Sequence, residues 1–256
     1  MADKSGADGG LRELALFAGA GGGILGGHLL GWRTVCAVEY EPYAASVLVA
    51  RQNDGLLPAF PIWDDVRTFD GRPWRGLVDV VSGGFPCQDI SVAGRGKGLE
   101  GKRSGLFFQI IRLTEELKPR FVFLENVPAI RTRGLDVVLK EFTRIGYDCR
   151  WTVVSAAEVG APHLRKRWFL LAHSNGSRIR EQPGRSSGKD WEGEAVSQYD
   201  GENNADWWIT EPDVGRVVNG LPCRVDRIRC LGNSVVPQQA QEAFKKLIIL
   251  GGIDAV

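Results

Sequence analysis

Short apolar runs recur along the chain and alternate with stretches of helical character, and this alternation restricts the possible folds more than any other feature. The runs expected to form strands are 11–17, 34–39, 77–83, 121–126, 151–156 and 167–173. Helices are expected at 42–52, where proline holds the first helical position, at 105–118, and from Pro237 onward. Strands that alternate with helices pack into a mostly parallel sheet. The sequence therefore predicts an α/β fold with a Rossmann-like, doubly wound mixed sheet.

Composition narrows the class of protein. With 43% hydrophobic and 25% charged residues, the 256-residue chain is typical of a globular protein. No apolar run approaches the roughly 18 residues that a membrane span needs. The five cysteines are an odd number and include no CxxC pair, which disfavours disulfides and a metal site and favours a reducing, cytoplasmic setting. Because the net charge is only +1, any binding of nucleic acid must rely on local basic clusters, such as those in 163–189 and 224–229.

The first apolar run ends in a glycine-rich turn, FAGAGGGILGG. The glycines that fit G-x-G-x-x-G or the looser F-x-G-x-G-G are Gly19, Gly21, Gly22, Gly23 and Gly26. Glycine lets the backbone turn sharply and lets a ligand approach the N-terminus of the following helix. Glu39 ends the next run, 20 residues after Gly19, a spacing that suits a carboxylate binding a ribose hydroxyl. These features predict a nucleoside cofactor, and both a dinucleotide and S-adenosylmethionine fit them.

Asp65 lies before the third apolar run, in the sequence WDDV. In a doubly wound sheet this position falls near the adenine end of a nucleoside cofactor. A loop aspartate also commonly caps a local turn, and the sequence leaves both interpretations open.

Cys87 follows the third run in SGGFPCQDIS. Loops at the carboxyl ends of strands form the ligand crevice of a doubly wound sheet, so Cys87 and the pair Glu125 and Asn126 are expected to face one crevice. Arg165 and Arg167 lie at the start of a later strand. A thiol, an acid and arginines that converge on one pocket suggest covalent catalysis on a polar, planar substrate. Taken singly, Cys87 also fits a small buried side chain, and the Glu-Asn pair a helix cap.

These motifs resemble, in order and over nearly the whole chain, those of the DNA cytosine-5 methyltransferase family. The segments that carry the resemblance are FAGAGG (17–22), GGFPCQDIS (83–91), GLEGKRSGLFFQIIR (98–112), ENV (125–127), GAPHLRKRWFLLA (160–172) and GNSVVPQ (232–238). The resemblance implies the methyltransferase fold and S-adenosyl-L-methionine as cofactor. The residues that it assigns to cofactor binding are Phe17, Gly19, Gly21, Gly22, Glu39, Asp65, Pro86, Asn233 and Ser234.

The resemblance also implies a mechanism. Cys87 adds to C6 of a cytosine flipped out of double-stranded DNA, a methyl group passes from S-adenosyl-L-methionine to C5, and elimination follows. Glu125 stabilises N3 as a neutral acid or hydrogen-bond donor, which requires a raised pKa. Arg165 and Arg167 hold O2 of the base and the glutamate.

Two further residues and the domain organisation follow from the same resemblance. Asn126 and His163 are assigned to substrate binding, although His163 stands where the family usually has glutamine. The catalytic domain is expected at 11–173 and 216–256, with the C-terminal helix packing back on it. A short, irregular target-recognition region is expected at 174–215.

The implied protein is a monomeric enzyme of host-modification or phage type that acts on double-stranded DNA, without a metal and without a membrane. A binding-only relative is disfavoured by the intact Pro-Cys and ENV motifs. An RNA methyltransferase of the same superfamily is a closer rival, but the branch that acts on transfer RNA usually has Cys-Phe-Thr, which this sequence lacks. A nicotinamide-dependent oxidoreductase would leave SGGFPC and ENV unexplained.

Overall fold

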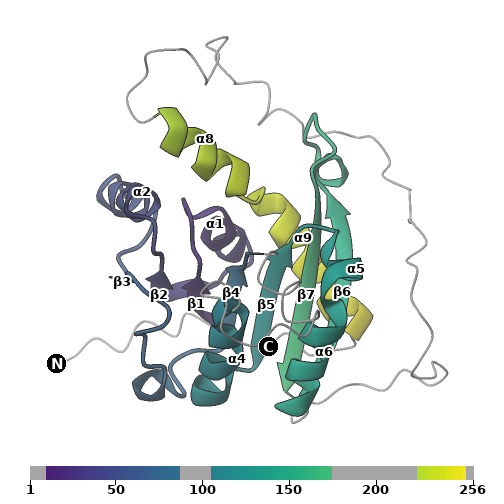
Figure 1. The fold of residues 1–256 in the computed structure, drawn as a ribbon. Helices are drawn as coiled ribbons and strands as arrows, with labels where there is room; N and C mark the ends of the chain where they lie inside the picture. The colour runs from purple at the N-terminus through teal and green to yellow at the C-terminus, as the bar shows by residue number, and fades with distance from the viewer. Residues whose placement is uncertain (1–9, 87–104, 175–223, 252–256) are drawn as a thin grey trace.

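The computed structural model describes residues 10–86, 105–174 and 224–251, and these form an α/β structure around one seven-stranded sheet (Figure 1). The strand order is β3-β2-β1-β4-β5-β7-β6. The strands are β1 (Arg12–Leu16), β2 (Arg33–Val38), β3 (Ile62–Trp63), β4 (Val80–Gly84), β5 (Phe121–Asn126), β6 (Tyr147–Ser155) and β7 (Lys166–Ser174). The first five strands are parallel, and β7 runs antiparallel to both β5 and β6. The predicted mixed, Rossmann-like sheet is confirmed.

Helices cover both faces of this sheet. They are α1 (Gly22–Leu29), α2 (Pro42–Asn53), α4 (Gly105–Leu117), α5 (Ile130–Arg133), α6 (Leu135–Arg144), α8 (Arg224–Asn233) and α9 (Pro237–Gly251). Successive strand residues point to opposite faces, so Leu14 and Leu16 pack with α4 and α6, whereas Ala15 packs with α1 and α2. A sheet covered on both faces buries whole strands, which is why β5 is a continuous apolar run until its last two residues.

The carboxyl ends of β1, β4 and β5 meet at one edge of the sheet. The three strands are parallel neighbours, with Leu16 beside Gly83 and Gly84 beside Glu125. The glycine turn after β1, Pro86 after β4 and the end of β5 are therefore brought together, although they lie far apart in the sequence.

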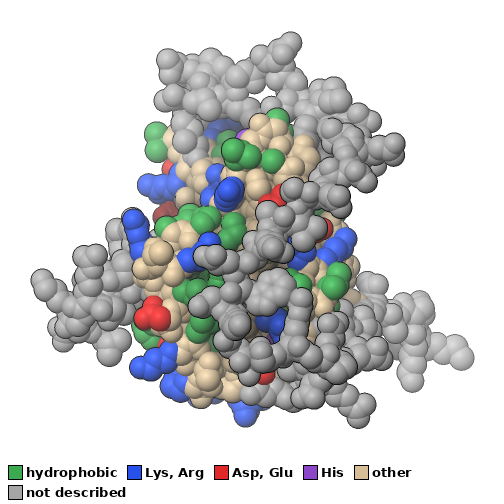
Figure 2. Space-filling model, turned by 90° about the vertical axis from the view of Figure 1, so that its right-hand side faces the viewer, with side chains coloured by type: hydrophobic (Ala, Val, Ile, Leu, Met, Phe, Trp, Pro, Cys, Tyr) green, Lys and Arg blue, Asp and Glu red, His purple; other side chains and the backbone are tan. Residues whose placement is uncertain are grey.

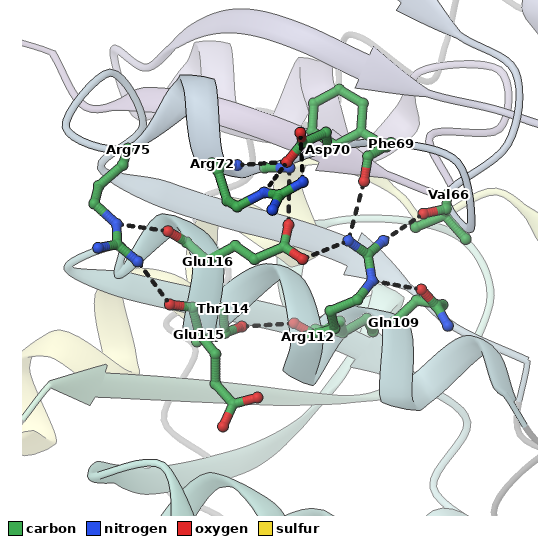
Figure 3. Close-up of polar contacts among 12 residues, drawn as sticks. Val66, Phe69, Asp70, Arg72, Arg75, Gln109, Arg112, Thr114, Glu115 and Glu116 are labelled. Carbon is green, nitrogen blue, oxygen red and sulfur yellow. Dashed lines mark hydrogen bonds and ion pairs between the residues drawn. The ribbon is translucent and has the colours of Figure 1, made fainter.

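The connection between β3 and β4 is anchored to α4 by a polar network (Figure 3). The Arg112 guanidinium donates to the carbonyls of Val66 and Phe69, at 2.8 and 3.1 Å. It also pairs with Glu116 at 2.8 Å, and the second oxygen of Glu116 accepts a hydrogen bond from the amide of Gly71. Because the connection contains only one turn of 3-10 helix and follows a strand of only two residues, these bonds to α4 stabilise its course into β4.

Neither a membrane span nor a metal site is found in the described part of the chain. None of its helices is long and apolar enough to cross a membrane. The residues described also contain no cluster of three His, Cys, Asp or Glu side chains that could hold a metal ion. Cys87 and residues 175–215 of the expected target-recognition region lie outside the described residues.

Candidate active site

A cavity of about 600 Å³ opens at the carboxyl edge of the sheet. Its walls come from the glycine turn and α1, from the ends of β4 and β5, and from α8 and the segment that leads into α9. The predicted site residues that line it are Phe17, Gly19, Gly22, Glu39, Pro86, Glu125, Asn126, Arg167, Asn233 and Ser234. The structure thus gathers ten of the predicted residues around one space.

The turn after β1 has a left-handed backbone at Phe17, Gly19 and Gly21, with φ of 52°, 55° and 91°. Such a conformation is uncommon for phenylalanine and easy for glycine. Glu39 at the end of β2 holds the turn, because its carboxylate accepts hydrogen bonds from the amides of Gly19 and Glu41, at 2.6 and 2.7 Å. A carboxylate offers about four acceptor positions, so Glu39 keeps the capacity to bind a ligand in the cavity.

Two glycines of α1 pack against α9 and the segment before it. A Cβ atom on Gly22 would lie 2.6 Å from the carbonyl oxygen of Val235, and one on Gly26 would lie 2.9 Å from the Cβ of Ala240. These positions therefore allow α9 and the segment before it to approach α1 closely. Gly22 and Gly26 therefore have a packing role that the sequence does not predict, besides the expected approach of a ligand.

Glu125, at the end of β5, is a largely buried carboxylic acid that lines the cavity. Its side chain is 19% exposed and its Oε1 lies 2.7 Å from Nε of Arg167, which is 14% exposed. Burial raises the pKa of Glu125 to about 7, because the loss of hydration outweighs the opposing attraction of Arg167 and Arg165. Gly84 leaves room for the carboxyl group, since a Cβ there would lie 2.7 Å from Oε2. A carboxyl group with this pKa is present in both protonation states near neutral pH.

Asn126 connects the ends of β5 and β4. Its side-chain amide donates to the carbonyl of Phe85 at 2.8 Å, and its side-chain oxygen accepts from the amide of Val127 at 2.8 Å. The buried side chain therefore fixes the backbone just before Pro86, which lines the cavity and immediately precedes Cys87 in the sequence.

Gly21, Asp65, His163 and Arg165 are not among the residues that line the cavity. Asp65 forms a salt bridge with Arg67 at 2.7 Å, and hydrogen bonds from Arg67 lower its pKa, which matches the local interpretation left open above. His163 is exposed in the loop before β7. The Arg165 guanidinium donates to the carbonyls of Gly232 and Ser234.

Helix α8 contributes residues that sequence reasoning missed. Asp226, Arg229 and Cys230 line the cavity, and Arg229 forms an ion pair of 3.4 Å with Glu41. In the sequence this region stands out only as a basic cluster, because it lacks an apolar period. The sequence feature that could have identified these residues is their position directly before the GNSVVPQ segment.

Comparison with known proteins agrees with this geometry. A family model described as C-5 cytosine-specific DNA methylase matches residues 11–211. The Type II methyltransferase M.CviJI of Paramecium bursaria Chlorella virus IL3A is 37% identical over 246 residues, which cover 92% of this chain and 59% of that protein. The Type II methyltransferase M.HhaI of Haemophilus parahaemolyticus is 33% identical over 176 residues, which cover 67% of this chain and 51% of that protein. The chain thus spans just over half the length of these relatives.

A solved structure shows the same fold. A variant of Spodoptera frugiperda DNMT2 matches with a TM-score of 0.54 and 18% identity, over 68% of this chain and 54% of that one. The family model covers most of the chain, and its match includes the glycine turn, the Pro-Cys segment and the glutamate at the end of β5. The chain therefore belongs to the C-5 cytosine-specific DNA methylase family.

Proposed function

We propose that this protein methylates C5 of cytosine in double-stranded DNA, with S-adenosyl-L-methionine as methyl donor, as a modification enzyme of restriction-modification or phage type. Membership of the cytosine-5 methylase family supports this reaction. The observation that carries the proposal is Glu125, whose pKa is raised to about 7 at a cavity that also contains the glycine turn and the residue preceding Cys87. This chemistry needs a neutral acid beside a thiol.

The cavity fits the methyl donor. Its volume of about 600 Å³ lies in the range of small-molecule sites. Phe17 offers an aromatic face for adenine, and Glu39 offers acceptors for the ribose hydroxyls. Asn233 and Ser234 supply further polar groups, from the end of α8 and the residue after it. When bound, S-adenosyl-L-methionine supplies a methyl group activated by its sulfonium centre.

The protein's own groups solve a problem of reactivity. Cytosine C5 is too weak a nucleophile to take a methyl group directly. Addition of the Cys87 thiolate to C6 makes C5 electron-rich and moves negative charge toward N3 and O2. Neutral Glu125 donates its proton toward N3, while Arg167 keeps the carboxyl group oriented. After methyl transfer to C5, the C5 proton passes to water and the thiolate leaves, which restores the ring, and N3 returns its proton to Glu125.

The base must leave the duplex before these groups can reach it. Flipping it out costs a few kcal/mol, which contacts to the DNA backbone must offset. On the face shown in Figure 2, the described Lys and Arg side chains are spread over several places with acidic side chains among them. Such a surface supports binding through local contacts that weaken as salt is added.

The proposal is tested by following a labelled methyl group. Radiolabelled S-adenosyl-L-methionine should label cytosine in duplex DNA, and Cys87→Ser should abolish the transfer. DNA containing 5-fluorocytosine should trap the wild-type protein in a complex that survives denaturation, because fluorine cannot leave as a proton does. Cys149→Ala, which removes a partly buried thiol in β6, is the matched control and should still be trapped. Label on adenine, or on RNA alone, would refute the assignment.

A further inference from the structure

Arg165 bonds to the end of α8 and to the residue that follows it, while its charge also attracts Glu125. Its Nη2 atom donates to the carbonyl oxygen of Gly232 at 2.7 Å and to that of Ser234 at 2.5 Å. Gly232 lies in the last turn of α8, where backbone carbonyls have no partner within the helix. A guanidinium at this position satisfies such carbonyls and complements the negative end of the helix dipole.

The same segment is tied to the main chain of Arg165 as well. Gln239, in the first turn of α9, is fully buried. Its side-chain amide donates to the carbonyls of Arg165 and Val154, at 2.6 and 2.8 Å. Both ends of the short connection between α8 and α9 are therefore bonded to Arg165, the residue just before β7, and the α9 end is also bonded to β6.

On its other side the connection packs directly on the glycine turn. A Cβ atom on Gly22 would lie 2.6 Å from the carbonyl oxygen of Val235 and 2.7 Å from Oγ of Ser234, so α1 and the connection have no space between them. Gly232, Asn233, Ser234 and Val235 all line the cavity. The position of this part of the cavity wall therefore depends on the hydrogen bonds that Arg165 and Gln239 make to the connection and its ends.

The two arginines of the R-K-R sequence thus bind different parts of the site. Arg167 pairs with Glu125, on the side where the base reacts. Arg165 bonds to the α8–α9 connection; burial and the charge of Arg167 lower its pKa, and the charge of Glu125 opposes this shift. We propose that Arg165 is a positioning residue for the cofactor side of the cavity, and that it acts by fixing residues 232–235 against the glycine turn. This inference rests on the proposed function and replaces a role for Arg165 at cytosine O2.

The test compares cofactor binding with local exposure of the connection. The probe is S-adenosylhomocysteine, whose dissociation constant is measured by calorimetry without DNA. Arg165→Met keeps the unbranched apolar stem of the side chain but donates no hydrogen bond. It should weaken binding roughly tenfold or more and accelerate amide hydrogen exchange at residues 232–239. At saturating S-adenosyl-L-methionine, kcat should change by no more than a few-fold.

Two companion variants separate positioning from general destabilisation. Arg165→Lys can reach one carbonyl rather than two, so it should restore part of the affinity. Arg150→Met removes a guanidinium bond to the carbonyl of Leu250, 3.2 Å long, at the opposite end of α9. This matched control should leave both the affinity and the exchange at 232–239 unchanged.

The inference is overturned if Arg165→Met leaves affinity and exchange as in the wild type, or if it lowers kcat while the KM for S-adenosyl-L-methionine stays constant. The second result would place Arg165 at the base. Failure of the proposed function appears in the wild type itself, as absence of S-adenosylhomocysteine binding or of methyl transfer to cytosine. The positioning role for the cofactor would then fall with it, whereas failure of the positioning role alone appears only in the comparison of variants.

Discussion

The raised pKa of Glu125 makes the stability of the fold depend on pH. The substitution Glu125→Gln separates this dependence from that of the other titratable groups. In the folded protein the pKa is about 7, against an ordinary value of 4.5. As the pH rises above 4.5, the unfolded chain gives up a proton that the folded protein still holds. The folded state therefore loses stability as the pH rises, and the loss is complete above pH 7. The difference between the two pKa values corresponds to about 3 kcal/mol of unfolding free energy.

Glu125→Gln keeps the shape of the neutral side chain but cannot ionise. Between pH 5 and pH 8, the wild type should lose about 2.5 kcal/mol of unfolding free energy relative to this variant. Burial also raises the pKa of Glu13 to about 7, but Glu13 titrates in both proteins and cancels in the comparison. The measurement is urea unfolding of both proteins at the two pH values and one ionic strength.

Asp79→Asn is the control for the pH change itself. Hydrogen bonds from Arg12 lower the pKa of Asp79, so this group is ionised in the folded and the unfolded protein throughout the range from pH 5 to pH 8. Its effect on stability should be the same at both pH values. If the difference between the wild type and Glu125→Gln also stays constant, within about 0.5 kcal/mol, the pKa of Glu125 is not raised and the neutral-acid role loses its physical basis.

Three further predictions follow from the same structure. The kcat of the wild type should fall above pH 7, by up to about tenfold per pH unit, and Glu125→Gln should lose this descending limb; a limb that persists in the variant belongs to another group. Gly84→Ala would place a methyl group 2.7 Å from a Glu125 oxygen, so kcat should fall roughly tenfold or more while DNA affinity in a gel-shift assay is kept; an unchanged kcat would show that the carboxyl group has room to move. Arg112→Met should lower the free energy of unfolding in urea by about 2 kcal/mol, because it removes the hydrogen bonds to the 66–69 turn, whereas Arg72→Met, at an exposed salt bridge, should lower it far less. Equal losses would refute the anchoring role.

The central strands could be predicted because burial on both faces leaves a strong apolar signal. The run 121–126 became β5 with the expected bounds. The edge strand β6 begins at Tyr147, four residues earlier than expected, because Asp148 and Arg150 in its first part are exposed and break the apolar run. Helix α6 was missed, although Val138 and Phe142 bury one stripe at i and i+4 within a polar stretch.

The site residues, too, were predictable where strands position them and not where loops do. Residues at the ends of parallel strands, such as Glu39 and Glu125, were predicted to converge because topology alone brings strand ends to one edge. The contacts of Asp65 and Arg165 depend on the course of loops, and hydrophobic periodicity carries no information about loops. The part played by α8 in the cavity could not be inferred, because residues that face a ligand space do not produce an apolar period.

The close packing of α1 on α9 has a consequence for the order in which the protein becomes competent during synthesis. The side chain of Gln241 on α9 donates to the carbonyl of Leu29 at the end of α1, across 212 residues of chain, and Gly26 lies against Ala240. A growing polypeptide can pair β1 with β2 early, but it cannot complete the pocket until α9 has emerged from the ribosome tunnel. Nascent chains should therefore carry a sheet with an open pocket and be unable to retain the methyl donor. Under the proposed function, the protein becomes able to methylate DNA only after this contact, across 212 residues of chain, has closed.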